Sequence, residues 1–311
     1  MTTLTRSTPQ ISTTVRNFLK LGLLRTQFMA MGTLTPDAAT ARAIRLFCQP
    51  YPSARPRALV APTFGARESD LDIAGTSIHV YAWGDPSAQP YVLFAHGWSS
   101  HGTRIASWLS PLREAGYAVI AFDQAAHGRS SGTLTTLPDF ARHLGAVGRH
   151  FGPAAAVIGH SLGGAAAMLA LANGLDAARA ILIAPAADPL AAAERFSRAI
   201  RLPLHLARRM FVPFERQMHF DVDDLQVHHN APRIGRPALI VHDLGDREVP
   251  WCEGERYARF WPDSRLLTTQ DLGHHRIADD ADVIAAGMRF LDGEVVGDHV
   301  VSSTNLPYGF A

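Results

Sequence analysis

Residues 157–164, VIGHSLGG, decide the fold of this 311-residue chain. They place Ser161 in a G-x-S-x-G motif between two apolar runs. The run before the motif, residues 154–158, ends in β-branched residues typical of a buried strand, and the run after it, residues 165–172, consists of strong helix formers. A strand that turns sharply into a helix lifts the serine hydroxyl to the tip of the turn, where flanking glycines leave room for it. The helix N-terminus also offers backbone N–H groups to a developing oxyanion. The motif therefore predicts a serine nucleophile.

A second G-x-S-x-G match covers residues 128–132. Residues 133–138, TLTTLP, follow it and open no apolar helix at the serine. Because a motif match is only a hypothesis until its context agrees, we interpret Ser130 as a loop residue.

The chain alternates between strand-like and helix-like segments. Apolar runs predict strands at residues 91–95, 118–122, 154–158, 180–183 and 238–241. Helix-like segments lie between them at residues 103–115, 137–151 and 162–173. Residues 71–74 and 78–83 flank Gly75-Thr76 and predict a hairpin. This alternation predicts an α/β fold with a mostly parallel sheet covered by helices on both faces, and with function at the carboxyl ends of its strands.

We expect three parts along the chain. Residues 1–66 should form a helical arm, with helical spacing over residues 36–47, and then a proline-rich connector. Residues 67–295 should form the α/β domain, and residues 296–311 a C-terminal tail.

The stretch at residues 189–236 interrupts the alternation of strands and helices. Its arginines are interspersed with apolar residues, which predicts two short amphipathic helices broken near Pro203. We expect a small helical cap over the strand ends, and a plain surface insertion is the alternative.

Composition narrows the classes of partner and cofactor. The net charge of +1 gives no indication of a nucleic-acid partner. Two cysteines, Cys48 and Cys252, form no disulfide framework. The histidine pairs at residues 228–229 and 274–275 lack zinc-ligand spacing, so we expect neither a metal nor an organic cofactor.

The N-terminal residues leave the location open. No run approaches the ~18 apolar residues of a membrane span. The first 36 residues contain no Asp or Glu but four cations, so residues 15–31 could form an arm that packs on the protein, contacts a membrane surface, or belongs to a targeting segment. Lys20 is the only lysine, and this arginine bias indicates GC-rich coding. We therefore expect a bacterial, cytoplasmic protein, with a membrane-associated or organellar location as the alternative.

A serine nucleophile needs a base and a group that orients the base. Residues 239–250, LIVHDLGDREVP, and residues 271–276, DLGHHR, offer these groups. From about Asp70 to Leu291 the chain resembles the α/β-hydrolase superfamily, and within it the esterase, monoacylglycerol-lipase-like and "serine aminopeptidase" type. The resemblance implies an α/β-hydrolase fold and the order serine, acid, histidine along the chain.

The family pattern I-H-G-x-x-D-x-x-V-P places Asp246 at the acid position. Asp243 stands where the family usually has glycine and offers a rival carboxylate, and Asp188 is a third candidate after residues 180–183. In the family a glycine directly precedes the catalytic histidine, which favours His274 over His275 as the base.

The oxyanion hole needs two backbone donors. One should be the Leu162 N–H, directly after the nucleophile. The other, by resemblance to the family's H-G-x loop at residues 96–98, should be the Trp98 N–H. Residues 122–130 resemble a family turn in which Asp123 and His127 are structural.

These residues predict a serine hydrolase that cleaves carboxylic esters, or thioesters, of small to medium acyl chains through an acyl-enzyme on Ser161. The expected class is carboxylesterase, with a small-molecule ester as substrate. An acyltransferase that uses the same acyl-enzyme, a peptidase or amidase, and a non-catalytic binding protein are the alternatives.

Overall fold

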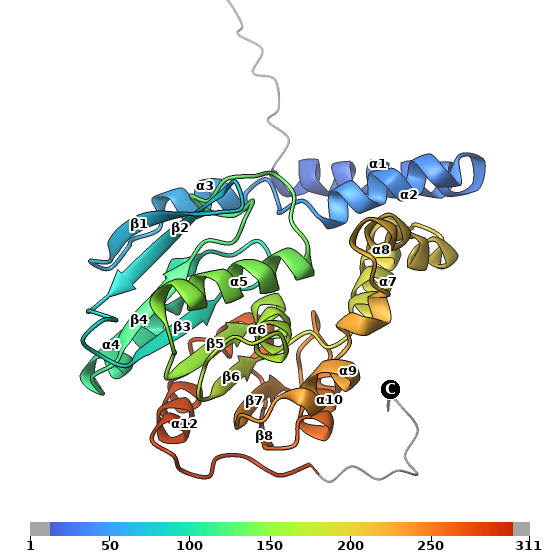
Figure 1. Cartoon of the computed structure of the whole chain (residues 1–311). Coiled ribbons are helices and arrows are strands. Elements are labelled where there is room, and N and C mark those ends of the chain that lie inside the picture. The colour runs from blue at the N-terminus through green and yellow to red at the C-terminus, as the bar shows by residue number, and fades with distance from the viewer. Residues whose placement is uncertain (1–12, 301–311) are drawn as a thin grey trace, which may run out of the picture. The chain divides into compact units, whose positions relative to one another are not determined.

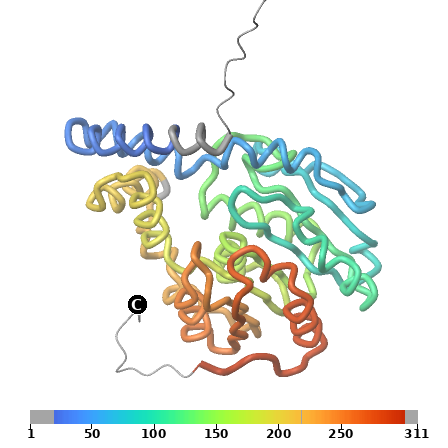
Figure 2. Tube along the Cα trace, turned by 180° about the vertical axis from the view of Figure 1, so that it is seen from behind, coloured from blue at the N-terminus to red at the C-terminus, as the bar shows by residue number. Residues whose placement is uncertain are grey.

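The computed structural model describes residues 13–300 of the chain. The chain divides into two compact units. One, which we call the helical unit, joins Met1–Phe47 with Leu190–Phe220, and the other, which we call the sheet unit, joins Cys48–Pro189 with Asp221–Ala311. Figure 1 labels the strands and most of the helices of both units, and Figure 2 gives the reverse view.

The sheet unit is built on eight strands in the order β1-β2-β4-β3-β5-β6-β7-β8. Their bounds are β1 Arg67–Ile73, β2 Thr76–Trp83, β3 Tyr91–Ala95, β4 Ala118–Phe122, β5 Ala156–His160, β6 Ala180–Ile183, β7 Ala238–Asp243 and β8 Ser264–Thr269. The hairpin β1–β2 is antiparallel, β2 pairs antiparallel with β4, and the strands from β4 to β8 in this order are parallel. The predicted mostly parallel sheet is confirmed, and the architecture is the α/β-hydrolase fold.

Helices cover both faces of this sheet, because the central strands are apolar on both sides. Leu93 and Ala95 of β3 belong to a core shared with α5, α6 and α10, whereas Val92 and Phe94 point into a second core shared with α4 and α12. These helices span α4 Ala106–Glu114, α5 Leu137–Phe151, α6 Leu162–Ala172, α10 Trp251–Phe260 and α12 Ala281–Leu291. Shorter helices of the unit are α3 Ala54–Val60, α9 Val227–Asn230 and α11 Gly273–Arg276.

Several boundaries differ from the prediction: β1 begins at Arg67 and not at Leu71, and β7 continues to Asp243. The helix expected over residues 103–115 begins with the 3-10 turn Gly102–Ile105 and becomes α-helical at Ala106. The strand expected at residues 154–158 runs from Ala156 to His160, because Gly159 and His160 still pair with β6. The helix predicted over residues 137–151 is confirmed, and its start is fixed by a capping box between Thr136 and Asp139.

The helical unit contains α1 Thr13–Leu34, α2 Pro36–Phe47, most of α7 Pro189–Ile200, and α8 Val212–Met218. Its own core joins apolar residues from both segments of chain, namely Phe28, Ala39, Ala43, Ile200, Leu202, Leu206 and Met210. Pro203 can approach α1 closely at Gly32 because glycine has no side chain, and a Cβ there would lie 2.5 Å from the Pro203 ring.

The expected insertion at residues 189–236 is therefore divided. Residues 190–220 share a core with the N-terminal helices, and residues 221–236, including α9, belong to the sheet unit. The reason is that short amphipathic helices need an apolar partner, which α1 and α2 supply. The expected arm at residues 1–66 is divided as well, since α3 lies in the sheet unit. Residues 301–311 of the expected tail lie outside the described residues.

None of the helices in residues 13–300 has the length and apolar character needed to cross a membrane.

Candidate active site

The turn that carries Ser161 is a strained strand-to-helix corner. Ser161 has φ 56° and ψ −121°, which L-residues rarely adopt and which costs about 1–3 kcal/mol. Its N–H donates to the Ile183 carbonyl oxygen at 2.9 Å. A Cβ at Gly159 would lie 2.6 Å from the Gly163 oxygen, and one at Gly163 would lie 2.1 Å from the Ala95 oxygen. The strand–turn–helix context predicted for this serine is present, and its glycines are required by space.

The structure brings Ser161, His274 and Asp246 into one hydrogen-bonded chain. The Ser161 Oγ lies 2.9 Å from His274 Nε2, and His274 Nδ1 lies 2.7 Å from Asp246 Oδ2. The three side chains follow the carboxyl ends of β5, β8 and β7, respectively. Because the carboxylate can only accept, Nδ1 carries the imidazole proton and Nε2 is free to accept the serine proton.

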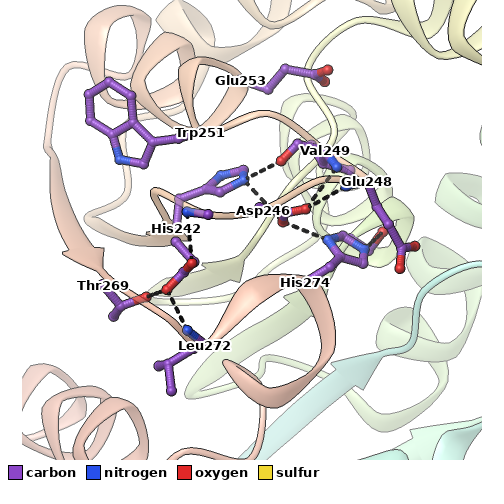
Figure 3. A network of polar contacts seen from close by, with 12 residues as sticks. His242, Asp246, Glu248, Val249, Trp251, Glu253, Thr269, Leu272 and His274 are labelled. Carbon is purple, nitrogen blue, oxygen red and sulfur yellow. Dashed lines mark hydrogen bonds and ion pairs between the residues drawn. The ribbon is translucent and has the colours of Figure 1, made fainter.

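The Asp246 carboxylate has donors on both oxygens. Its Oδ1 accepts from the N–H groups of Glu248 at 2.8 Å and Val249 at 2.9 Å, and its Oδ2 accepts from His274 (Figure 3). Burial alone would raise the Asp246 pKa, but hydrogen bonds from His242, His274 and the Val249 N–H outweigh it and hold that pKa well below its ordinary value. The carboxylate is therefore ionised at neutral pH.

Asp243 has a different set of partners. Its Oδ2 accepts from the Thr269 hydroxyl at 2.8 Å and from the Leu272 N–H at 3.0 Å, and its Oδ1 accepts from the Gly245 N–H at 2.9 Å. It thus fastens the loop that leads from β8 to His274.

The other two alternatives also have partners of their own. Asp188 pairs with Arg256 at 3.2 Å, and His275 is an exposed residue whose Nε2 lies 2.9 Å from Glu248. Of the candidate acids and bases, only Asp246 and His274 join the hydrogen-bonded chain to Ser161.

The loop that carries Trp98 contacts the serine turn. A Cβ at Gly97 would lie 3.0 Å from the Ser161 Cβ, and the Trp98 ring stacks on Phe140 with centroids 6.1 Å apart. Leu162 is the first residue of α6, so its N–H has no acceptor within the helix. Neither the Trp98 nor the Leu162 amide has an acceptor among the described residues.

The residues expected to be structural form a buried network behind this loop. His127 Nε2 accepts from the Ser99 N–H at 2.9 Å, and His96 Nε2 accepts from the Gln124 N–H at 3.0 Å. Asp123 accepts from the Gly102 N–H, the Arg129 N–H and the Tyr81 hydroxyl. The Ser130 hydroxyl donates to the Asp123 carbonyl oxygen.

Two further histidines touch the site, and sequence reasoning gave them no role. His160 Nε2 donates to the His274 carbonyl oxygen at 2.9 Å, and burial lowers the pKa of His160 to about 3. His242 Nε2 donates to the Val249 carbonyl oxygen at 2.9 Å and lies 3.5 Å from Asp246 Oδ2. Their one sequence signal is their position at the carboxyl ends of β5 and β7.

Within residues 13–300, no three His, Cys, Asp or Glu side chains are grouped so as to hold a metal ion.

Residues 86–227 match the family described as serine aminopeptidase, S33. The match covers 142 of the 311 residues, and together with the fold it makes the chain similar to the α/β-hydrolase superfamily. Among curated proteins, none matches the sequence.

Solved structures resemble the chain at low identity. A bacterial membrane phospholipase A is 18% identical with a TM-score of 0.59, over 90% of this chain and 98% of that one. The α/β-hydrolase domain-containing protein 10 from mouse is 20% identical with a TM-score of 0.57, over 73% and 97% of the two chains. An esterase from Exiguobacterium antarcticum is 18% identical with a TM-score of 0.57, over 73% and 100%. At these identities the likeness concerns the fold alone.

Proposed function

We propose that this protein is a serine hydrolase that cleaves carboxylic esters, or thioesters, of small to medium acyl chains. The observation that carries the proposal is the hydrogen-bonded chain from the Ser161 hydroxyl through His274 to the ionised Asp246. Esterases and a thioesterase domain among the structures of similar fold support the same class of substrate. We propose a cytoplasmic location for the enzyme.

The reaction follows from the geometry. Ser161 Oγ attacks the ester carbonyl while His274 Nε2 takes the hydroxyl proton, and Asp246 stabilises the imidazolium that forms. The Trp98 and Leu162 amides bind the oxyanion. The imidazolium then protonates the leaving alcohol, or thiol, which departs and leaves an acyl-enzyme on Ser161. Water, deprotonated by His274, attacks the acyl-enzyme and releases the acid.

The test is hydrolysis of p-nitrophenyl esters of increasing acyl length by the wild type and by Ser161→Ala. Activity in the wild type alone supports the proposal, and the optimum acyl length defines the substrate class. Adding an alcohol or thiol acceptor shows whether the acyl group is hydrolysed or transferred. Equal activity in both proteins, or no labelling of the wild type by a fluorophosphonate, would contradict the proposed role of Ser161.

A further inference from the structure

The net charge of the whole chain conceals a strong division between its two units. The helical unit, Met1–Phe47 with Leu190–Phe220, contains 12 Lys and Arg against 3 Asp and Glu, a net charge of +9. The whole chain has 29 against 28, so the sheet unit contains 17 against 25, a net charge of −8. The cationic charge is thus concentrated in the smaller unit.

The carboxylates of the helical unit already have partners within it. Each is paired with an arginine of the same unit: Asp37 with Arg209 at 2.5 Å, Glu194 with Arg198 at 3.0 Å, and Glu215 with Arg208 at 2.6 Å. Lys20, Arg42 and Arg45 therefore have no carboxylate of the same unit left to pair with, and an anionic surface would complement them.

One side of α1 combines this charge with exposed apolar side chains. Lys20, Leu23 and Leu34 share a side of the helix by their spacing, and Leu23 and Leu34 are 62% and 78% exposed. Gln27 of the same side accepts a hydrogen bond from Arg42 of α2 at 2.9 Å, so the Arg42 guanidinium adjoins this side. Another side of α1 carries Phe28 into the core of the unit.

We propose that the helical unit binds an anionic lipid surface, with this side of α1 lying in the interfacial plane. Apolar side chains would enter the boundary of the acyl chains, while Lys20, Arg42 and Arg45 meet the headgroups. A nucleic acid would match the charge but would leave Leu23 and Leu34 without an apolar environment. The proposal does not depend on the proposed hydrolase activity.

The test is co-sedimentation of the full chain with vesicles of phosphatidylcholine, alone or mixed with phosphatidylglycerol. We expect binding to the anionic vesicles that weakens as salt is added. Lys20→Gln with Arg45→Gln should lower the partition constant roughly 30-fold, since each cation near the surface is worth about a factor of five. Leu23→Ser with Leu34→Ser should lower it at least roughly 100-fold.

Matched controls come from the sheet unit. Arg149→Gln and Val60→Ser replace an exposed cation and an exposed apolar residue there, and both should leave the partition unchanged. Ester hydrolysis by the two double variants should match the wild type, which keeps a failure of lipid binding distinct from a failure of the proposed function.

Two results would overturn the proposal. One is no preference for anionic vesicles, or a partition that the two leucine substitutions leave unchanged. The other is tighter binding of a labelled single-stranded RNA than of anionic vesicles, which would assign the cationic surface to nucleic acid.

Discussion

At the scale of single residues, the Asp246 side chain shows why one carboxylate can orient the imidazole and its neighbours cannot. Backbone N–H groups of Glu248 and Val249 hold one of its oxygens, and the other faces His274. Asp243 uses both of its oxygens on the loop that carries His274. Asp246 is therefore placed to orient the His274 ring, and Asp243 to position the backbone of the loop that carries His274.

Asp246→Asn should lower kcat by about 10⁴-fold, because an amide can offer its N–H to His274 Nδ1 and so stabilise the wrong tautomer. The measurement is p-nitrophenyl ester hydrolysis at saturating substrate. Asp188→Asn is the matched control and should retain near-normal turnover. Near-normal turnover of Asp246→Asn would move the role of the acid to another carboxylate.

At the scale of elements, the serine turn depends on how closely three segments approach. The end of β3, the end of β5 and the start of α6 meet where Gly159 and Gly163 have no side chain. His160, the last residue of β5, reaches back to the backbone of His274. The turn between β5 and α6 thus carries the nucleophile Ser161 and, through His160, also binds the backbone of the base His274.

Gly163→Ala should destabilise the sheet unit by about 1–3 kcal/mol, because its Cβ would lie 2.1 Å from the Ala95 oxygen. The displaced loop also carries Trp98, so kcat should fall as well. Gly235→Ala is the control, since a Cβ there meets nothing within 4 Å. Urea unfolding and ester hydrolysis measure the two effects, and equal stability of both variants would contradict the account of the turn.

At the scale of the whole molecule, the chain builds two units from segments that alternate along the sequence. Phe28 is fully buried in the core of the helical unit. All five tryptophans lie in the sheet unit, so their fluorescence reports on that unit alone. The two units can therefore be followed separately during unfolding.

Phe28→Ala should destabilise the helical unit by about 3–5 kcal/mol, because it leaves a large cavity in a small core. We expect far-UV circular dichroism to lose helix at lower temperature, while the tryptophan transition stays near that of the wild type. Fluorophosphonate labelling of Ser161 should persist. A single transition that moves by the same amount for both signals would show that the two units unfold together.

The stability of the sheet unit should fall with acidification well before its carboxylates titrate. Burial lowers the pKa of His96, His127 and His160 to about 3 and that of His143 to about 4, whereas an unfolded histidine titrates near 6.5. Below pH 6.5 the unfolded chain binds protons that the folded chain excludes. The free energy of unfolding should therefore drop by up to about 1.4 kcal/mol per pH unit for each histidine, until the pH reaches the pKa of that histidine in the folded chain.

The measurement is the urea midpoint by tryptophan fluorescence between about pH 7.5 and pH 5. In His160→Gln the slope should be smaller by up to about a quarter, because one of the four histidines with strongly lowered pKa is removed. A midpoint that stays constant over this range would contradict the prediction.

The sequence by itself determined the local features of this protein. The apolar runs, the helix spacing and the G-x-S-x-G motif act through neighbouring residues, so they predicted the α/β order and the turn at Ser161. The family pattern favoured Asp246 over Asp243, but only the tertiary structure showed which atoms each carboxylate reaches: Asp246 faces the His274 ring, and Asp243 binds the loop before it. It also joined residues 1–47 to residues 190–220, since an amphipathic helix carries an apolar stripe that does not specify its distant partner. The same pairing separates a positive helical unit from a negative sheet unit, and these two charges nearly cancel in the net charge of +1 of the whole chain.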